Sequence, residues 1–219
     1  MLIHILENGG FIVYAIILMS VFGFAVIVER GVYFYRNERH SGTVLLEHVE
    51  RFIIQGDRDK AIEVCREFKN TSSVVMEAII NEYQSCSING CNYHFLEEKA
   101  RECALREMPK LEKNMWVLSI AAHVTPLAGL FGTVTGMIQA FMAISSNGTG
   151  DPTILATGIS QALITTAAGL AVAIPTLIFY NFYSRKIEDA MTNMEKNVVE
   201  FINFLRKQVD GHECKKIFS

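Results

Sequence analysis

Three long stretches of the sequence contain no Asp, Glu, Lys or Arg, and they constrain the fold more than any other feature. They are Asn8–Val28, Asn114–Gly150 and Pro152–Ser184. A helix that rises about 1.5 Å per residue needs roughly 20 apolar residues to cross a hydrocarbon core of about 30 Å, and each stretch is long enough. The sequence therefore predicts an all-α membrane protein with three transmembrane helices and long cytoplasmic helical extensions.

The distribution of positive charge predicts the orientation of these helices. Residues 30–113 and 185–216 contain all 20 Lys and Arg residues, whereas residues 1–10 and 145–153 contain none. Because Lys and Arg accumulate on the cytoplasmic side of a membrane, we expect the N-terminus outside and the C-terminus inside. The first span should be retained, since no positive region precedes it and Glu29-Arg30-Gly31 follows where a cleavage site would lie.

The charged segments divide the chain into six expected sections. They are an outer tail with transmembrane helix 1 (1–29), a cytoplasmic helical domain (30–115), transmembrane helix 2 (116–144), an outer loop (145–153), transmembrane helix 3 (154–183) and a cytoplasmic C-terminal helix (184–219). In the cytoplasmic domain, helical periodicity predicts helices around 45–53, after Asp57, near Ser73–Tyr83 and from Tyr93.

The C-terminal helix has an apolar seam with heptad spacing, formed by Ile187, Met191, Met194, Val198, Phe201 and Leu205. Two interpretations remain open at this point. The seam packs against the chain's own cytoplasmic helices, or it associates with another copy of the chain.

The five cysteines all lie on the predicted cytoplasmic side, where thiols stay reduced, so we expect no disulfide. Cys86, Cys91, His94 and Cys103 are close in sequence, but their spacing fits no strong zinc signature. We therefore expect no metal and no cofactor.

The third span carries a polar stripe although nothing in it can titrate. At about 100° per residue, one face collects five residues within about 60° of Gln161: Thr157, Gln161, Thr165, Ala168 and Thr176. Thr166 lies about 140° away, so we expect it to face a neighbouring helix. Polar groups in a membrane helix face protein or water, because lipid cannot satisfy them.

The second span carries a matching stripe of small residues around Thr133, formed by Ala122, Gly129, Thr133, Gly136 and Ala140. Gly132 and Gly136 also form a GxxxG pair. Such glycines, with Gly169 of the third span, favour close helix packing in lipid. Both stripes are consistent with packing alone, with threonines bonded to their own helices, or with the lining of a polar path. His123 is a candidate proton relay, or it simply forms a hydrogen bond at a helix interface.

Two motifs, "PLAGLFGTVTGM" (126–137) and "GISQALITTAAGLAVAIPTLIFYNFY" (158–183), resemble those of the MotA/TolQ/ExbB proton-channel family, most closely its three-span ExbB/TolQ branch. The resemblance implies a homopentamer in the bacterial inner membrane, around the single-span helices of an ExbD/TolR-like partner with a membrane Asp. Proton transfer at that Asp would drive rotation. Thr133 and Thr166 match the family's pore threonines, and with Gln161 and Thr165 they form the predicted ion-pathway lining.

The chain departs from the family's pattern at Gln161, where better-known ExbB and TolQ sequences carry a glutamate. Gln161 cannot hold a proton as a carboxylic acid does, and no other carboxylate lies within the spans. The titrating acid should therefore come from the partner, with hydroxyl groups expected to lower the cost of its charged state. A sodium-coupled motor and a non-conducting membrane scaffold are the alternatives. We expect that the protein is not an enzyme, since the sequence contains neither a Walker loop nor a Ser–His–acid pattern. We also expect no nucleic-acid partner. The process that such a motor would drive, whether nutrient uptake, envelope maintenance or gliding, is left open.

Overall fold

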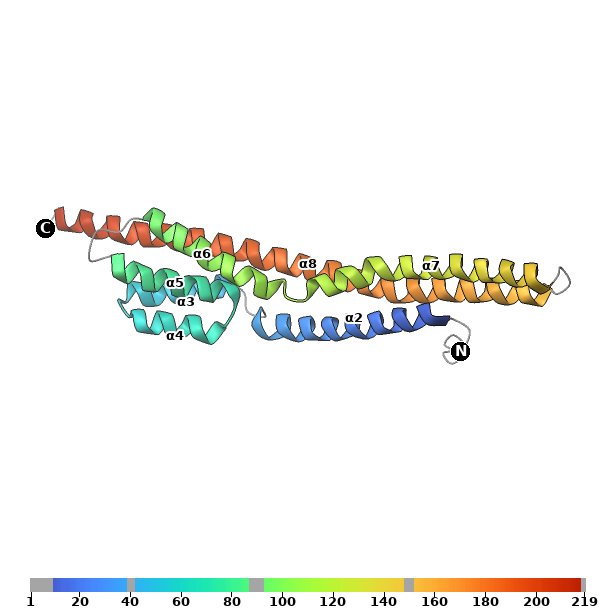
Figure 1. The fold of residues 1–219 in the computed structure, drawn as a ribbon. Coiled ribbons are helices and arrows are strands. Elements are labelled where there is room, and N and C mark those ends of the chain that lie inside the picture. Colours follow the sequence, from blue (N-terminus) through green and yellow to red (C-terminus); the bar gives the residue numbers. More distant parts are fainter. Residues whose placement is uncertain (1–9, 39–41, 87–92, 148–151, 218–219) are drawn as a thin grey trace. The chain divides into compact units, whose positions relative to one another are not determined.

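The computed structural model describes residues 10–38, 42–86, 93–147 and 152–217, and every element in these ranges is an α-helix (Figure 1). The helices are α2 (Gly10–Asn37), α3 (Gly42–Ile54), α4 (Arg58–Phe68), α5 (Thr71–Cys86), α6 (Tyr93–Leu111), α7 (Met115–Asn147) and α8 (Pro152–Ile217). Three segments are long and apolar enough to cross a membrane, namely Phe11–Asn37, Met115–Ser145 and Leu155–Gln208. The predicted all-α class with three transmembrane helices is confirmed.

The described residues form two compact units. One, here called the membrane unit, contains the described parts of residues 1–30 and 114–184, and the other, here called the charged unit, contains those of 31–113 and 185–219. Helix α8 contributes to both, since it continues through Pro175 and through the first charged residues, Arg185 and Lys186. Its 66 residues exceed what a bilayer needs by about threefold.

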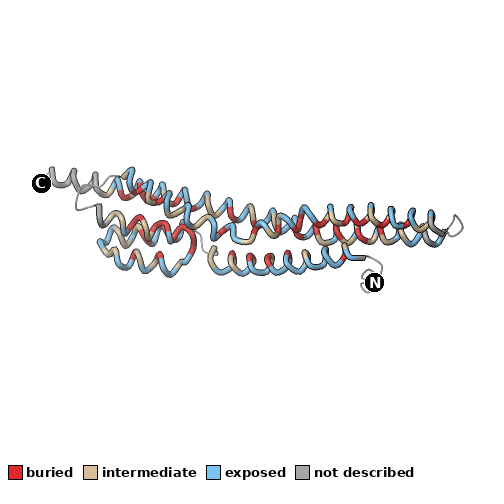
Figure 2. The backbone as a smooth tube through the Cα atoms, viewed as in Figure 1, coloured by how far each residue is buried: buried red, intermediate tan, exposed pale blue. Residues whose placement is uncertain are grey.

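Within the membrane unit, α7 and α8 pack antiparallel, and α2 packs beside them. The Tyr183 hydroxyl on α8 donates to the carbonyl oxygen of Ile27 on α2 at 2.8 Å. Large apolar residues of this unit are exposed, including Leu18, Phe22, Leu127, Phe131, Leu163 and Ile174, all more than half exposed. Figure 2 shows exposed positions along α2, α7 and α8. Lipid accepts such a surface without the free-energy cost that water would impose.

A polar contact joins the last turns of the apolar part of α2 to the start of α7. The Glu29 carboxylate accepts a hydrogen bond from the Asn114 side-chain amide at 2.7 Å and pairs with Arg30 at 3.0 Å. Asn114 has a left-handed backbone conformation (φ 60°), which an α-helix does not accommodate, so it lies between the end of α6 and the start of α7.

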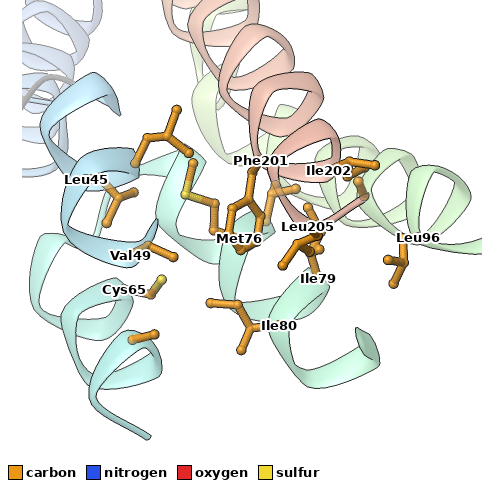
Figure 3. Close-up of a cluster of buried hydrophobic side chains, with 14 of the residues drawn as sticks. Leu45, Val49, Cys65, Met76, Ile79, Ile80, Leu96, Phe201, Ile202 and Leu205 are labelled. Atoms are coloured by element: carbon orange, nitrogen blue, oxygen red, sulfur yellow. The ribbon is translucent and has the colours of Figure 1, made fainter. Parts of the chain in front are cut away.

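The charged unit has its own hydrophobic core, in which α8 packs against α3, α5 and α6 (Figure 3). Met194, Phe201 and Leu205 of the apolar seam are almost fully buried there, and Met191 and Val198 pack at its edge. The first interpretation of the seam is therefore confirmed, because the chain's own helices cover it. Phe201 is the largest side chain among the fully buried residues.

Helix ends in the charged unit are capped by polar side chains. Asp57 caps α4 by accepting from the Lys60 amide, and the residue after α4, Lys69, adopts a left-handed conformation. At the start of α5, the Glu38 carboxylate accepts from both the amide and the hydroxyl of Thr71, at 3.0 and 2.7 Å. A carboxylate at this position also complements the positive end of the helix dipole.

Cys65 and Cys103 are free thiols, in agreement with the expectation for these two residues. Burial, with a smaller contribution from nearby Glu77, raises the pKa of Cys65 to about 12, so this thiol stays protonated at neutral pH. The described residues contain no group of three or more side chains able to hold a metal ion. Cys91 and the side chains of Cys86 and Cys214 lie outside the described residues.

Candidate functional site

The contact between α7 and α8 depends on glycines whose backbones touch the opposite helix. A Cβ atom on Gly129 would lie 2.9 Å from the Thr165 carbonyl oxygen, and one on Gly169 would lie 2.6 Å from that of Thr125. Gly132 directly faces the Thr165 side chain, and a Cβ on Gly136 would lie 3.3 Å from the Cβ of Ala162. All four predicted packing glycines therefore lie in this one interface, and an added Cβ would come closer than 3.0 Å to the opposite helix at Gly129, Gly132 and Gly169.

Thr165 is part of this interface. Its side chain is 2% exposed, and its hydroxyl donates to the Ala162 carbonyl at 2.7 Å, with the Gly129 carbonyl 3.4 Å away. The hydroxyl is thus enclosed between two helices of one chain. Thr165 therefore packs between α7 and α8, while the ion-pathway lining of Thr133, Gln161, Thr165 and Thr166 stays a prediction.

Thr166, next to Thr165 in sequence, lies at the edge of the same interface. Its hydroxyl donates across the interface to the Gly129 carbonyl of α7 at 3.2 Å, while the residue remains partly exposed. Thr166 therefore contacts a neighbouring helix, as the sequence suggested. The Gly129 backbone can approach it because Gly129 has no side chain.

Thr133 of α7 lies one helical turn after Gly129, whose carbonyl accepts from Thr166, and Thr133 is also partly exposed. Its hydroxyl donates to the carbonyl of Leu130 at 2.6 Å. The hydroxyls of Thr133 and Thr166 thus come from two different helices and donate to two successive carbonyls of α7, those of Leu130 and Gly129.

Both threonines are turned away from α2. Helix α2 touches α7 through Gly23, whose added Cβ would lie 3.6 Å from that of Ala121. Thr133 is about 120° round α7 from Ala121, and Thr166 is about 100° round α8 from Tyr183, which bonds to α2. The flank of the α7–α8 pair that carries the two hydroxyls, here called the threonine flank, is left open by the described residues.

Gln161 does not lie on the threonine flank. It is partly exposed, about 140° round α8 from Thr166 and about 40° from Tyr183. Among the described residues, no group donates to or accepts from its amide. The structure therefore brings Thr133 and Thr166 together within one chain and leaves Gln161 on the other side of α8.

His123 lies at the exposed surface of α7, in its N-terminal half. Its Nδ1 is 2.7 Å from the Ser119 carbonyl oxygen, and its ring contacts the Tyr180 ring edge to face at 6.4 Å. Since a carbonyl only accepts, Nδ1 is the donor in this hydrogen bond. The imidazole thus bonds to its own helix, and a role of His123 as a proton relay stays a prediction.

Two residues of the interface were not singled out from the sequence. Gly158 of α8 directly faces Ala140, and the Thr125 carbonyl directly faces Gly169. The signal was present in α8 as small residues at 158, 162, 165 and 169, which repeat at three- and four-residue spacing on one face. They extend the close contact between α7 and α8 from Thr125 to Ala140.

These features define a multi-pass helical membrane protein with a tightly packed helix pair and hydroxyl groups, but no acid, on an open flank. Residues 68–196 match the MotA/TolQ/ExbB proton channel family. The chain belongs to this family.

Individual relatives point to its ExbB/TolQ branch. The chain is 28% identical over 194 residues, 88% of its length, to an ExbB homolog of the biopolymer transport proteins from Methanothermobacter thermautotrophicus, and covers 66% of that protein. It is 39% identical over 106 residues to the Tol-Pal system protein TolQ of Haemophilus influenzae, covering 48% of this chain and 46% of TolQ. It is 28% identical over 177 residues to the biopolymer transport protein ExbB of Neisseria meningitidis, covering 77% of this chain and 79% of that protein. The alignments with the first two therefore span less than two thirds of the relatives' own length.

Proposed function

We propose that the chain is the ring-forming subunit of an ion-driven motor, with protons as the coupling ion. Copies of the chain, five by family resemblance, would surround the single-span helices of an ExbD/TolR-like partner with a membrane Asp. The supporting observation is the threonine flank, where Thr133 and Thr166 occupy the motif positions of the family's pore threonines and remain partly exposed. Both hydroxyls already donate to carbonyls of α7, and their remaining lone pairs are available to a polar group that the partner brings into the ring.

The titrating group would be the partner's acid. No Asp or Glu occurs at positions 11–28, 115–147 or 152–184. An ionised carboxylate in the middle of a membrane costs about 2.5–3.5 kcal/mol on insertion scales. A proton that crosses 100 mV releases about 2.3 kcal/mol, so protonation of one acid is comparable in energy to one transfer step. The chain would then form the ring that surrounds this acid.

The proposed location is a bacterial inner membrane, with the N-terminus outside and the charged unit in the cytoplasm. The distribution of the 20 Lys and Arg residues supports this orientation, since all of them lie between residues 30 and 113 or after residue 184. Work would be delivered on the outer side, at the periplasm or outer membrane, through the partner.

The direct test is ion flux into liposomes that contain this chain together with its single-span partner. We expect proton flux that disappears when the partner's Asp is replaced by Asn, and also when Thr133 and Thr166 are both replaced by valine. The double Thr→Val variant should still copurify with the partner, because both hydroxyls bond within one chain.

Two other outcomes correspond to the alternatives. Sodium flux that requires the same Asp would identify a sodium-coupled motor and correct the coupling ion. A verified complex that passes neither ion would overturn the motor and leave a membrane scaffold.

A further inference from the structure

Seven threonine hydroxyls among the described residues of the membrane unit share one hydrogen-bonding state. Each donates to a backbone carbonyl, at distances between 2.5 and 3.2 Å. They belong to Thr125, Thr133, Thr135, Thr157, Thr165, Thr166 and Thr176. A carbonyl oxygen carries no proton, so each hydroxyl is the donor in its bond.

This state determines what the two hydroxyls of the threonine flank can offer to a ligand. A threonine hydroxyl has one proton and two lone pairs. Thr133 has used its proton on the Leu130 carbonyl, and Thr166 has used its proton on the Gly129 carbonyl. Only lone pairs remain to face an approaching group, so both side chains are acceptors.

We propose that Thr133 and Thr166 select the protonated form of the partner's membrane carboxylic acid, because their hydroxyls can accept a hydrogen bond but have no proton left to donate. A protonated carboxyl donates one O–H bond, and the flank can accept it. An ionised carboxylate offers only lone pairs, so it would meet lone pairs on both threonines. This inference rests on the proposed function and specifies which state of the acid the ring holds.

The proposal reverses the expectation drawn from the sequence, in which hydroxyl groups lower the cost of the charged acid. To stabilise a carboxylate, Thr133 or Thr166 would first have to break its bond to a carbonyl within a membrane, where water does not replace the lost bond. The flank therefore favours a proton on the acid, and release of the proton requires the acid to leave this flank.

The test is a titration of the partner's Asp in the reconstituted complex. The partner is labelled with ¹³C at its Asp carboxyl, and the carbonyl band of the protonated acid is followed by infrared spectroscopy as the pH is varied. If the hydroxyls accept from the protonated acid, then Thr133→Val or Thr166→Val should move the midpoint to lower pH by about half a unit to one unit.

Three control variants accompany this titration. Thr133→Ser and Thr166→Ser retain the hydroxyl and should leave the midpoint unchanged. Thr135→Val removes a hydroxyl that bonds to its own helix in the same way but lies about 160° further round α7 than Thr133, and it should have no effect.

Each result has a distinct meaning. A midpoint that moves to higher pH in the valine variants would show that the hydroxyls donate to the carboxylate, and would overturn the inference. An unchanged midpoint would also overturn it, since the threonines would then not contact the acid. In both cases proton flux that depends on the Asp would leave the proposed function intact, whereas a complex without flux would overturn the function and this inference together.

Discussion

The hydroxyl of Thr166 donates to the carbonyl oxygen of Gly129 on the neighbouring helix at 3.2 Å. The bond depends on the absence of a side chain at Gly129, where a Cβ atom would lie 2.9 Å from the Thr165 carbonyl and 3.1 Å from the Thr166 Cα. Both distances are shorter than ordinary contacts, and both involve backbone atoms that cannot rotate away.

Gly129→Ala should therefore separate α7 from α8 at the threonine flank. We expect a destabilised protein, by roughly 1–3 kcal/mol as for other overpacked interfaces, and loss of ion flux. The measurement is thermal unfolding of the purified protein in lipid nanodiscs, followed by flux with the partner.

Gly23→Ala provides the matched control. Its Cβ would lie 3.6 Å from that of Ala121 and 3.7 Å from the Thr176 hydroxyl, which are ordinary contact distances. Gly23→Ala should keep the wild-type melting temperature and flux. Equal losses in the two variants would show that any glycine replacement in this unit is harmful and that close approach at Gly129 is not special.

Phe201→Ala tests whether the core of the charged unit holds α8. Phe201 has no exposed surface, and replacement of a buried Phe by Ala typically costs about 3–5 kcal/mol. We expect a lower unfolding temperature and faster tryptic cleavage after Lys and Arg residues of the charged unit. Val199→Ala, at a position that is 59% exposed, is the control and should change neither. If Phe201→Ala were as stable as Val199→Ala, the seam would not be packed on its own chain.

Glu50→Gln should stabilise the charged unit at neutral pH. Partial burial, followed by repulsion from Glu200 and Glu47, raises the pKa of Glu50 above its ordinary value of 4.5. The ionised form is therefore less favourable in the folded than in the unfolded chain, and an uncharged amide removes that cost.

The gain from Glu50→Gln should depend on pH in a defined direction. It should be fully present above the raised pKa of the folded state and decrease as pH falls towards 4.5, where Glu50 becomes protonated in both states. Unfolding curves of both proteins at pH 4 and 7.5 measure this. A gain that grows on acidification would contradict the assigned cause.

The sequence predicted the helices of this fold better than it predicted which helix packs against which. Long uncharged stretches identify membrane helices because the bilayer imposes one length on every span, and the heptad seam identifies the buried face of α8. Helical angles also placed Thr166 against a neighbouring helix. They could not separate Thr165, enclosed beside Gly132, from a residue that lines a path, because that depends on which helix packs where.

The hydrogen-bonding state of the hydroxyls was also beyond the reach of the sequence. The hydroxyl of a threonine in a helix can donate to a carbonyl three or four residues before it, or it can donate to a ligand instead. The sequence does not distinguish these two states. Only the positions of the Leu130 and Gly129 carbonyls distinguish these states at Thr133 and Thr166. The sequence therefore left both states open.

Gln161→Glu tests whether this chain can supply the titrating acid itself. The substitution would place a carboxyl in the third span, but position 161 lies about 140° round α8 from Thr166. A carboxyl there would not lie on the threonine flank of the same chain, and its ionisation in the membrane would cost about 2.5–3.5 kcal/mol. We therefore expect that Gln161→Glu does not restore flux to a complex whose partner carries Asn in place of its Asp.

The complex of Gln161→Glu with the wild-type partner should still conduct. The Gln161→Met variant, whose side chain has a similar length but is apolar, separates the effect of polarity from that of charge. Flux through the Asn-bearing complex in the Gln161→Glu variant alone would show that the acid can reside on either chain, and the threonine flank would then not be where protonation is decided.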